Sequence, residues 1–181
     1  MKYFIGLDVH WQHSMLCILD AAGRIVKRLT LRGSWTKIAD ELRQWEGPLA
    51  VCYEASCGYG FLHDLLSQVA ARVVVAHPGH LRLIFRSKRK NDRVDAEKLA
   101  KLLWFDEVPT VHVPNEQVRA WRQLIEYRNA LVAKRTRAKN SCRSLLRSVG
   151  VRAPARRSLW TQAGQAWLAE VALPNMLYGL R

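Results

Sequence analysis

Acidic residues are scarce in this sequence, and their scarcity is uneven along the chain. The 181 residues include 29 Lys and Arg against 15 Asp and Glu, which gives a formal net charge of +14. Between Arg119 and Arg157 there are twelve basic residues and only one acidic residue, Glu126. A positive field of this strength favours a polyanionic partner, either nucleic acid or an acidic membrane surface.

Long apolar runs, paired cysteines and a secretory leader are also missing. No stretch approaches the roughly 18 to 20 apolar residues that a membrane span requires. The N-terminal MKYFIGLDVHWQH has a short apolar run and no small-residue cleavage site. The four cysteines form no C-x-x-C pair, so we expect reduced thiols and no zinc site. These absences predict a cytoplasmic protein without a membrane partner.

The first half of the chain carries alternating strand and helix patterns. Three strand patterns joined by short turns come first, and two apolar runs typical of buried strands follow: residues 2–10, 14–20, 24–31, 49–55 and 72–78. Ser34 is placed to cap a helix that runs to about Trp45. A meander followed by strand–helix repeats predicts an α/β domain with a mixed sheet and helices on its faces.

The chain changes character beyond Pro109. Asn115 is placed to cap a helix that meets no breaker before Gly150, and about 34 helical residues would span roughly 50 Å. Apolar residues recur along it every seven positions: Leu124, Leu131, Ala138 and Leu145. Arg128 and Arg135 interrupt the second seam of a regular coiled coil. We therefore predict a sheet domain over residues 1–110 and a basic, coiled-coil-like helical region over 111–181 that pairs with another helix.

Basic side chains gather at two places. Six of them follow the long helix: Lys134, Arg135, Arg137, Lys139, Arg143 and Arg147. A merely solvated helix usually carries both signs, so this row predicts salt-dependent binding to phosphates. A second cluster consists of Lys88, Arg89 and Lys90. Trp121 and Trp160 could stack on bases, although tryptophan at helical spacing is more typical of a core.

Four carboxylates lie at the ends of the predicted elements. Asp8 ends the first strand and Glu54 ends the fourth, where a site can collect side chains from distant positions. Asp92 and Asp95 begin a helix and share one of its faces. Carboxylates held together need bridging cations, and hard oxygen ligands suit Mg²⁺ or Mn²⁺. Two such ions would form a clamp for displacement at a phosphodiester.

Each carboxylate also has a simpler explanation. Asp8 could be a turn former, and Asp92 with Asp95 could be a helix cap and a first-turn charge. Glu54 is the most informative, because a carboxylate beside a buried strand is costly unless it is paired or liganded. Taken together, the set favours a metal site over four separate explanations.

Three segments, IGLDVH, YEASCGYG and KNDRVDAEKLA, resemble the signature blocks of the insertion-sequence transposases with a DEDD motif, also described as bridge-RNA-guided recombinases. The element order resembles the ribonuclease-H-like fold of the RuvC-like Holliday-junction resolvases. The family's four acidic residues correspond to Asp8, Glu54, Asp92 and Asp95. Asn91 stands where the family has Thr, a comparable small polar residue. The resemblance extends through the basic helix and the segment WLAEVALP.

The resemblance implies DNA transposition and recombination by metal-dependent phosphodiester chemistry. Its implied partners are DNA, a structured guide RNA and further copies of the chain, in a dimer or tetramer formed through the long helix. The implied location is the prokaryotic nucleoid. Family members carry a serine nucleophile in a second, C-terminal domain, and this sequence stops at LYGLR. We therefore expect the N-terminal part of a recombinase, which by itself lacks full DNA exchange.

Two other functions remain open. The chain could bind guide RNA without doing chemistry. It could also be an ATP-binding domain of the actin and sugar-kinase type, whose sheet begins in a similar way with an Asp at a strand end. That fold needs glycine-rich phosphate loops, and the stretch from Gly58 to Gly60 is a poor one.

Overall fold

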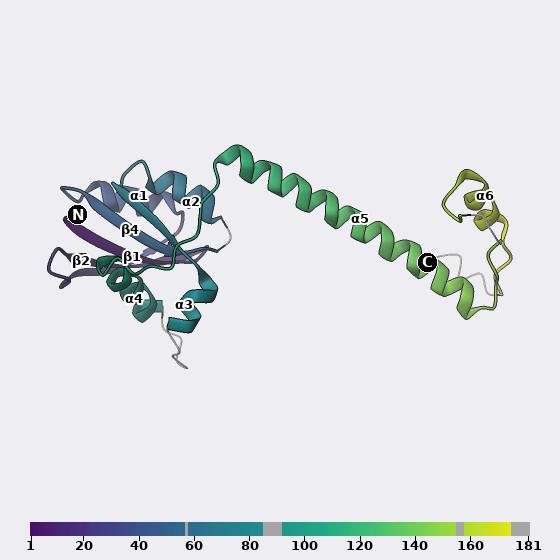
Figure 1. Ribbon diagram of the computed structural model, residues 1–181, viewed down its shortest axis with the longest axis horizontal. Helices are drawn as coiled ribbons and strands as arrows, with labels where there is room; N and C mark the ends of the chain where they lie inside the picture. Colours follow the sequence, from purple (N-terminus) through teal and green to yellow (C-terminus); the bar gives the residue numbers. More distant parts are fainter. Residues whose placement is uncertain (57, 85–91, 155–157, 175–181) are drawn as a thin grey trace. The chain divides into compact units, whose positions relative to one another are not determined.

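The computed structural model describes residues 1–56, 58–84, 92–154 and 158–174. Its contacts divide the chain into two compact units, Met1–Arg119 and Ala120–Arg181 (Figure 1). We call them the sheet unit and the helical unit.

The sheet unit is built on five strands, β1 (Tyr3–Val9), β2 (His13–Asp20), β3 (Ile25–Arg32), β4 (Leu49–Glu54) and β5 (Arg72–Ala76). Their order in the sheet is β3-β2-β1-β4-β5. β2 pairs antiparallel with β1 and with β3, as the short turns between these strands require. β4 pairs parallel with β1 and with β5, and a helix precedes each of β4 and β5 in the chain. The predicted mixed sheet is confirmed, and it is consistent with the ribonuclease-H-like fold.

Helices cover both faces of this sheet. α1 (Thr36–Arg43) and α2 (Tyr59–Leu66) lie on one face, α4 (Asp92–Trp104) lies on the other, and α3 (Pro78–Ile84) follows β5 (Figure 1). Alternation along the strands divides the core accordingly. Leu7 and Tyr53 pack with the first two helices, while Cys52 packs on the opposite face with Leu99. Burial on both faces explains why β4 reads as a continuous apolar run.

The helix α4 crosses β1 at a glycine. A Cβ atom on Gly6 would lie 2.0 Å from the Ala96 carbonyl oxygen and 2.4 Å from the Ala100 nitrogen, so only glycine fits there. The indole Nε1 of Trp104 donates to the Ala21 carbonyl oxygen at 3.1 Å. Ala21 is in the turn between β2 and β3, next to Asp20, which pairs with Tyr3 at the start of β1. α4 therefore runs opposite to β1, and its first residues point toward the carboxyl ends of β1 and β4.

The first helix differs from the sequence prediction at its start. α1 has Trp35 as its N-cap residue, without a side-chain hydrogen bond, so the predicted cap at Ser34 is wrong. The Ser34 hydroxyl instead accepts a hydrogen bond from the Thr36 backbone at 3.3 Å. The helix ends at Arg43, and the ring of Trp45 packs edge-on against Tyr3 at 4.9 Å. The Trp45 backbone still donates to the Leu42 carbonyl oxygen at 3.2 Å, so a hydrogen-bonded turn continues to the predicted end.

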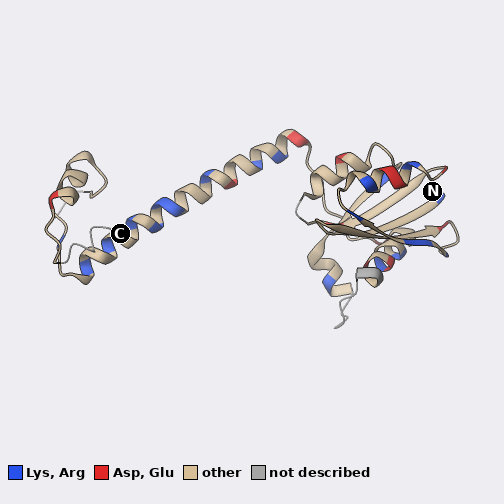
Figure 2. Cartoon of the chain, turned by 180° about the vertical axis from the view of Figure 1, so that it is seen from behind, with Lys and Arg blue, Asp and Glu red and all other residues tan. Residues whose placement is uncertain are grey.

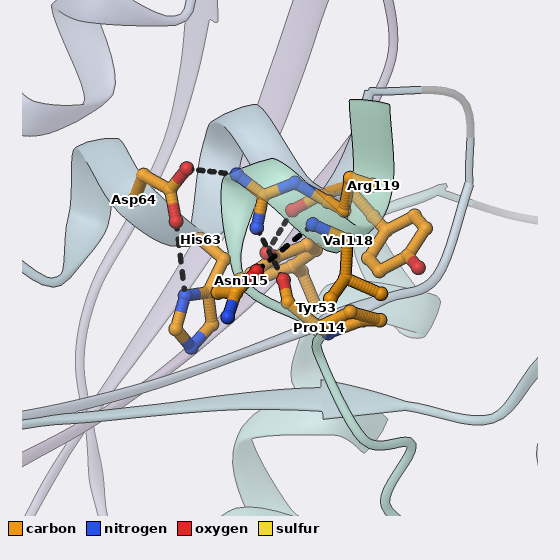
Figure 3. A network of polar contacts seen from close by, with 8 residues as sticks. Tyr53, His63, Asp64, Pro114, Asn115, Val118 and Arg119 are labelled. Atoms are coloured by element: carbon orange, nitrogen blue, oxygen red, sulfur yellow. Dashed lines mark hydrogen bonds and ion pairs between the residues drawn. The ribbon is translucent and has the colours of Figure 1, made fainter. Parts of the chain in front are cut away.

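Polar contacts hold the segment before α5 (Glu116–Ser148) to α2 (Figure 3). The Arg119 guanidinium pairs with Asp64 and donates to the Pro114 carbonyl oxygen at 2.6 Å. The Asn115 side chain accepts from the Val118 backbone at 2.9 Å, which confirms the predicted cap. The first residues of α5 are therefore fixed within the sheet unit.

The helical unit contains most of α5 and α6 (Gln162–Glu170). Leu146 is the single buried residue that α5 contributes. The Thr161 hydroxyl caps α6 by accepting a hydrogen bond from Gly164 at 3.3 Å. In the part of the chain that the structure describes, no helix is both long and apolar enough to cross a membrane.

Candidate carboxylate site and nucleic-acid interface

Asp8 and Glu54 lie at the same edge of the sheet. In the parallel ladder, Gly6 pairs with Cys52 and Leu7 pairs with Tyr53, so Asp8 and Glu54 occupy the next position on neighbouring strands. Successive side chains alternate between the two faces, which assigns both carboxylates to the face of Gly6 and Cys52. This is the face that α4 covers.

The first turn of α4, which carries the other two aspartates in the sequence, lies toward the same end of the sheet. Ala96 packs in a cluster with Met15, and Met15 is the cross-strand partner of Asp8. Asp95 immediately precedes Ala96 in the helix. Asp92 is the first residue of α4, although its side chain lies outside the described residues. The fold therefore brings the elements that carry all four predicted acids to one end of the sheet.

The described carboxylates have different surroundings. The His10 imidazole Nε2 lies 3.3 Å from an Asp8 carboxylate oxygen, and the Lys98 ammonium lies 3.1 Å from Asp95. Glu54 is exposed, although five buried residues precede it in β4. The expectation that an unpaired carboxylate at this position would carry a burial cost is therefore wrong. Glu54 is the last residue of β4, where the strand reaches solvent.

Among the side chains that the structure describes, no group of three His, Cys, Asp or Glu residues is close enough to hold a metal ion. Asp8, Glu54 and Asp95 alone thus do not form a closed site. Thiolate ligands from Cys52 and Cys17 are unfavourable, because burial raises the pKa of Cys52 to about 12 and raises that of Cys17 as well. The described carboxylates at this end of the sheet offer oxygen ligands.

A row of cations follows α5. Arg135, Lys139, Arg143 and Arg147 are four residues apart, so they share one face of the helix. Lys139 is partly buried and the other three are exposed, as are Lys134 and Arg137. Figure 2 shows Lys and Arg recurring along this helix. The second predicted cluster, Lys88, Arg89 and Lys90, lies outside the described residues.

The helical unit pairs part of this row with an aromatic ring. The Lys139 ammonium lies 5.1 Å and the Arg143 guanidinium 5.6 Å from the Trp160 ring centroid. Sequence reasoning missed this contact, because about twenty residues separate the partners. Trp121 is 58% exposed, so the expectation of a core position is wrong for it.

Residues 5–151 match the family model of the DEDD transposases of IS110 type, which is described as a transposase. A protein of Sinorhizobium fredii that is named as a candidate transposase, y4qE, is 32% identical over 120 residues. The aligned segment covers 66% of this chain and 30% of that relative, so the chain aligns with less than a third of the relative's length. The family match includes all four predicted acids and α5.

Proposed function

The chain belongs to the DEDD transposase family, and we propose that it supplies a carboxylate site for phosphodiester chemistry together with a cationic helix that binds nucleic acid. One observation carries the proposal. The parallel register of β1 and β4 sets Asp8 beside Glu54, at the end of the sheet toward which the first turn of α4 lies.

The donors at this edge suit a hard divalent cation. Asp8, Glu54, Asp92 and Asp95 would together hold Mg²⁺ or Mn²⁺, as two ions, because carboxylate oxygens are the preferred ligands of both metals. Held by these four residues, such ions would supply Lewis-acid chemistry for displacement at a phosphodiester. His10, which contacts Asp8 at 3.3 Å, would orient that carboxylate.

The cationic face of α5 is the proposed contact with the nucleic-acid backbone. Like charges four residues apart destabilise a helix by a few tenths of a kcal/mol per pair. Phosphates would remove this repulsion and release counterions, which makes binding favourable and dependent on salt. The proposed partners are DNA and a structured guide RNA, recognised largely by shape and backbone. These partners would place the protein with chromosomal DNA.

Self-association through α5 is a further part of the proposal. Large apolar side chains on this helix are exposed, including Leu124 at 66% and Leu131 at 46%. Their seven-residue spacing sets them along one stripe, and a second copy of the helix would bury it. A homo-oligomer, a dimer or tetramer, would then present several cationic faces to one nucleic acid.

Nicking of branched or single-stranded DNA with Mn²⁺ tests the carboxylate site. We expect Asp8→Asn and Asp92→Asn to abolish the cleavage that the native chain performs. Asp40→Asn is the matched control, because Asp40 is an exposed aspartate on α1 that pairs only locally with Arg43 at 2.6 Å. Equal cleavage by the native chain and the two site variants would contradict the proposal.

A binding function without chemistry is the second candidate. It is favoured by the small share of the relative that aligns, 30%, because residues needed for catalysis could lie in the remainder. In that case the native chain would not nick DNA but would copurify with one defined RNA. Sequencing the copurifying RNA tests this, and recovery of only bulk cellular RNA would count against a dedicated guide.

A further inference from the structure

An aromatic cleft lies at the same end of the sheet as the carboxylates, on the side of the sheet that α1 and α2 cover. It encloses about 790 Å³, and its lining includes Trp11, Gln12, Gly33, Trp35, Gly58 and Phe61. These residues come from the loops after β1 and β3 and from the start of α2. A backbone hydrogen bond from Gly33 to the Gln12 carbonyl oxygen, 2.9 Å long, joins the two loops. The volume lies within the roughly 300–1,000 Å³ of ligand sites.

Three aromatic rings face this cleft. The rings of Trp11 and Trp35 meet edge-on, with centroids 5.6 Å apart, and those of Trp35 and Phe61 are tilted at 6.2 Å. Trp11 is 81% exposed and Phe61 is 59% exposed. A cluster of exposed aromatic rings is unfavourable in water and is typical of a surface that binds a ligand or a partner molecule.

The central ring is held in position before any ligand arrives. The Trp35 indole Nε1 donates to the His10 carbonyl oxygen at 2.9 Å. Gly58 has a φ of +78°, and a Cβ there would lie 2.6 Å from the Trp35 ring, so glycine allows the ring to lie against the backbone. Trp35 is thus held by its own contacts, whereas Trp11 and Phe61 are the more exposed rings of the three.

We propose that this cleft stacks an unpaired nucleobase of the strand whose phosphate lies at the Asp8 edge. The inference rests on the proposed function, which brings a nucleic-acid strand to that edge. His10 joins the two places, because its carbonyl accepts from Trp35 and its imidazole contacts Asp8 at 3.3 Å. Aromatic side chains beside a path for the phosphates are the usual means of holding single strands.

The rim of the cleft favours a nucleotide over an apolar segment of protein. The Lys37 ammonium donates to the Arg32 carbonyl oxygen at 2.9 Å and would lie 3.4 Å from a Cβ on Gly33. Arg32 and Lys37 are both exposed. A base in the cleft would place its phosphate near these cations, whereas an apolar protein segment would gain nothing from them.

Fluorescence anisotropy with labelled oligothymidylate of about 12 nucleotides, in EDTA, tests the inference on the whole chain. We expect Trp11→Ala and Phe61→Ala each to weaken binding about tenfold, the range measured for loss of base stacking. Phe105→Ala is the control, because Phe105 is 62% exposed and lies outside the cleft. An abasic strand of equal length should bind the native chain and the cleft variants equally. Trp11→Phe should restore most of the affinity.

Unchanged affinity in both cleft variants would overturn the inference, as would an equal loss for the abasic strand. A Trp11→Ala chain that keeps its oligothymidylate affinity but loses self-association would also overturn it, in favour of a protein occupant. The outcome is separate from that of the carboxylate site. Asp8→Asn should abolish cutting, so cutting by Asp8→Asn would contradict the proposed function and leave the stacking result standing.

Discussion

The sheet unit and the helical unit are stabilised by different means. The sheet unit buries apolar side chains on both faces of β1 and β4, whereas α5 contributes one buried residue, Leu146, over its 33 residues. Residues 1–119 carry 17 basic and 13 acidic side chains, and residues 120–181 carry 12 and 2. The first unit therefore folds around its own core, while the second exposes apolar and cationic faces that partners would cover.

The largest expected effect is a loss of stability in the sheet unit. In Gly6→Ala the new methyl group would meet the Ala96 carbonyl oxygen at 2.0 Å, so α4 must separate from β1. We expect a loss of about 3 kcal/mol or more in the free energy of unfolding, as for overpacked cores, measured by urea denaturation.

Gly150→Ala is the control in the helical unit. Gly150 has a φ of +74° and nothing within 4 Å of its Cβ position, so alanine there costs only about 1 kcal/mol of backbone strain. Similar losses for the two variants would contradict the close packing of α4 on β1.

Neutralising the cationic face should have the next largest effect. We expect Arg135→Gln, Lys139→Gln and Arg147→Gln together to weaken duplex DNA binding at least about tenfold and to lower the salt slope by about 2 to 3. Arg143 is kept, so that one of the two cations over the Trp160 ring stays in place. Titrations at several salt concentrations measure both quantities.

A triple variant with the same change in charge is the control for that experiment. The control replaces three arginines of the sheet unit that each pair with an aspartate: Arg24, Arg43 and Arg72. A DNA phosphate would have to compete with that aspartate for each arginine. We expect their replacement by Gln to leave the salt slope nearly unchanged. An equal fall in both triple variants would show that net charge alone sets the affinity.

An effect of comparable size is expected on self-association. Leu124 on α5 and Leu83 on α3 are equally exposed, at 66% and 67%. If α5 pairs with a second copy, Leu124→Asn should weaken association by about 1 to 3 kcal/mol, the value of one buried leucine. Leu83→Asn should have no such effect. Sedimentation at several concentrations distinguishes them, and equal behaviour would argue against pairing through this stripe.

The smallest effect is a dependence on pH within the sheet unit. Hydrogen bonds from Lys101 and Arg28 lower the pKa of Glu97 below its usual 4.5. A lowered pKa in the folded state stabilises the protein above the unfolded value, and this contribution disappears as the pH falls through the folded pKa. We expect Glu97→Gln to cost about 1 kcal/mol at neutral pH and nothing in strong acid, by denaturation at both pH values. A constant difference would contradict this origin.

Local patterns in the sequence predicted most of the elements. Alternation and short turns indicated β1, β2 and β3, the apolar run of residues 49–55 indicated β4, and Asn115 marked the start of α5. These features depend on residues that are near one another in the chain, so local physics is sufficient to predict them.

The exposure of Glu54 and the start of α1 were predicted wrongly for a common reason. Glu54 follows five buried residues, yet it lies where the sheet ends. Ser34 has the right chemistry for a cap, yet Trp35 packs into the cleft and moves the helix start to Thr36. In both cases tertiary surroundings override the local preference.

The sequence by itself determined the strand and helix order, the charge asymmetry, and the placement of acids at element ends. Only the tertiary structure decided that Gly6 admits α4 against β1, that Trp11, Trp35 and Phe61 surround one cleft, and that Trp160 lies under Lys139 and Arg143. The physical reason is the distance along the chain. A turn or helix is formed by neighbouring residues, whereas these contacts form only when the packed core brings separate segments together.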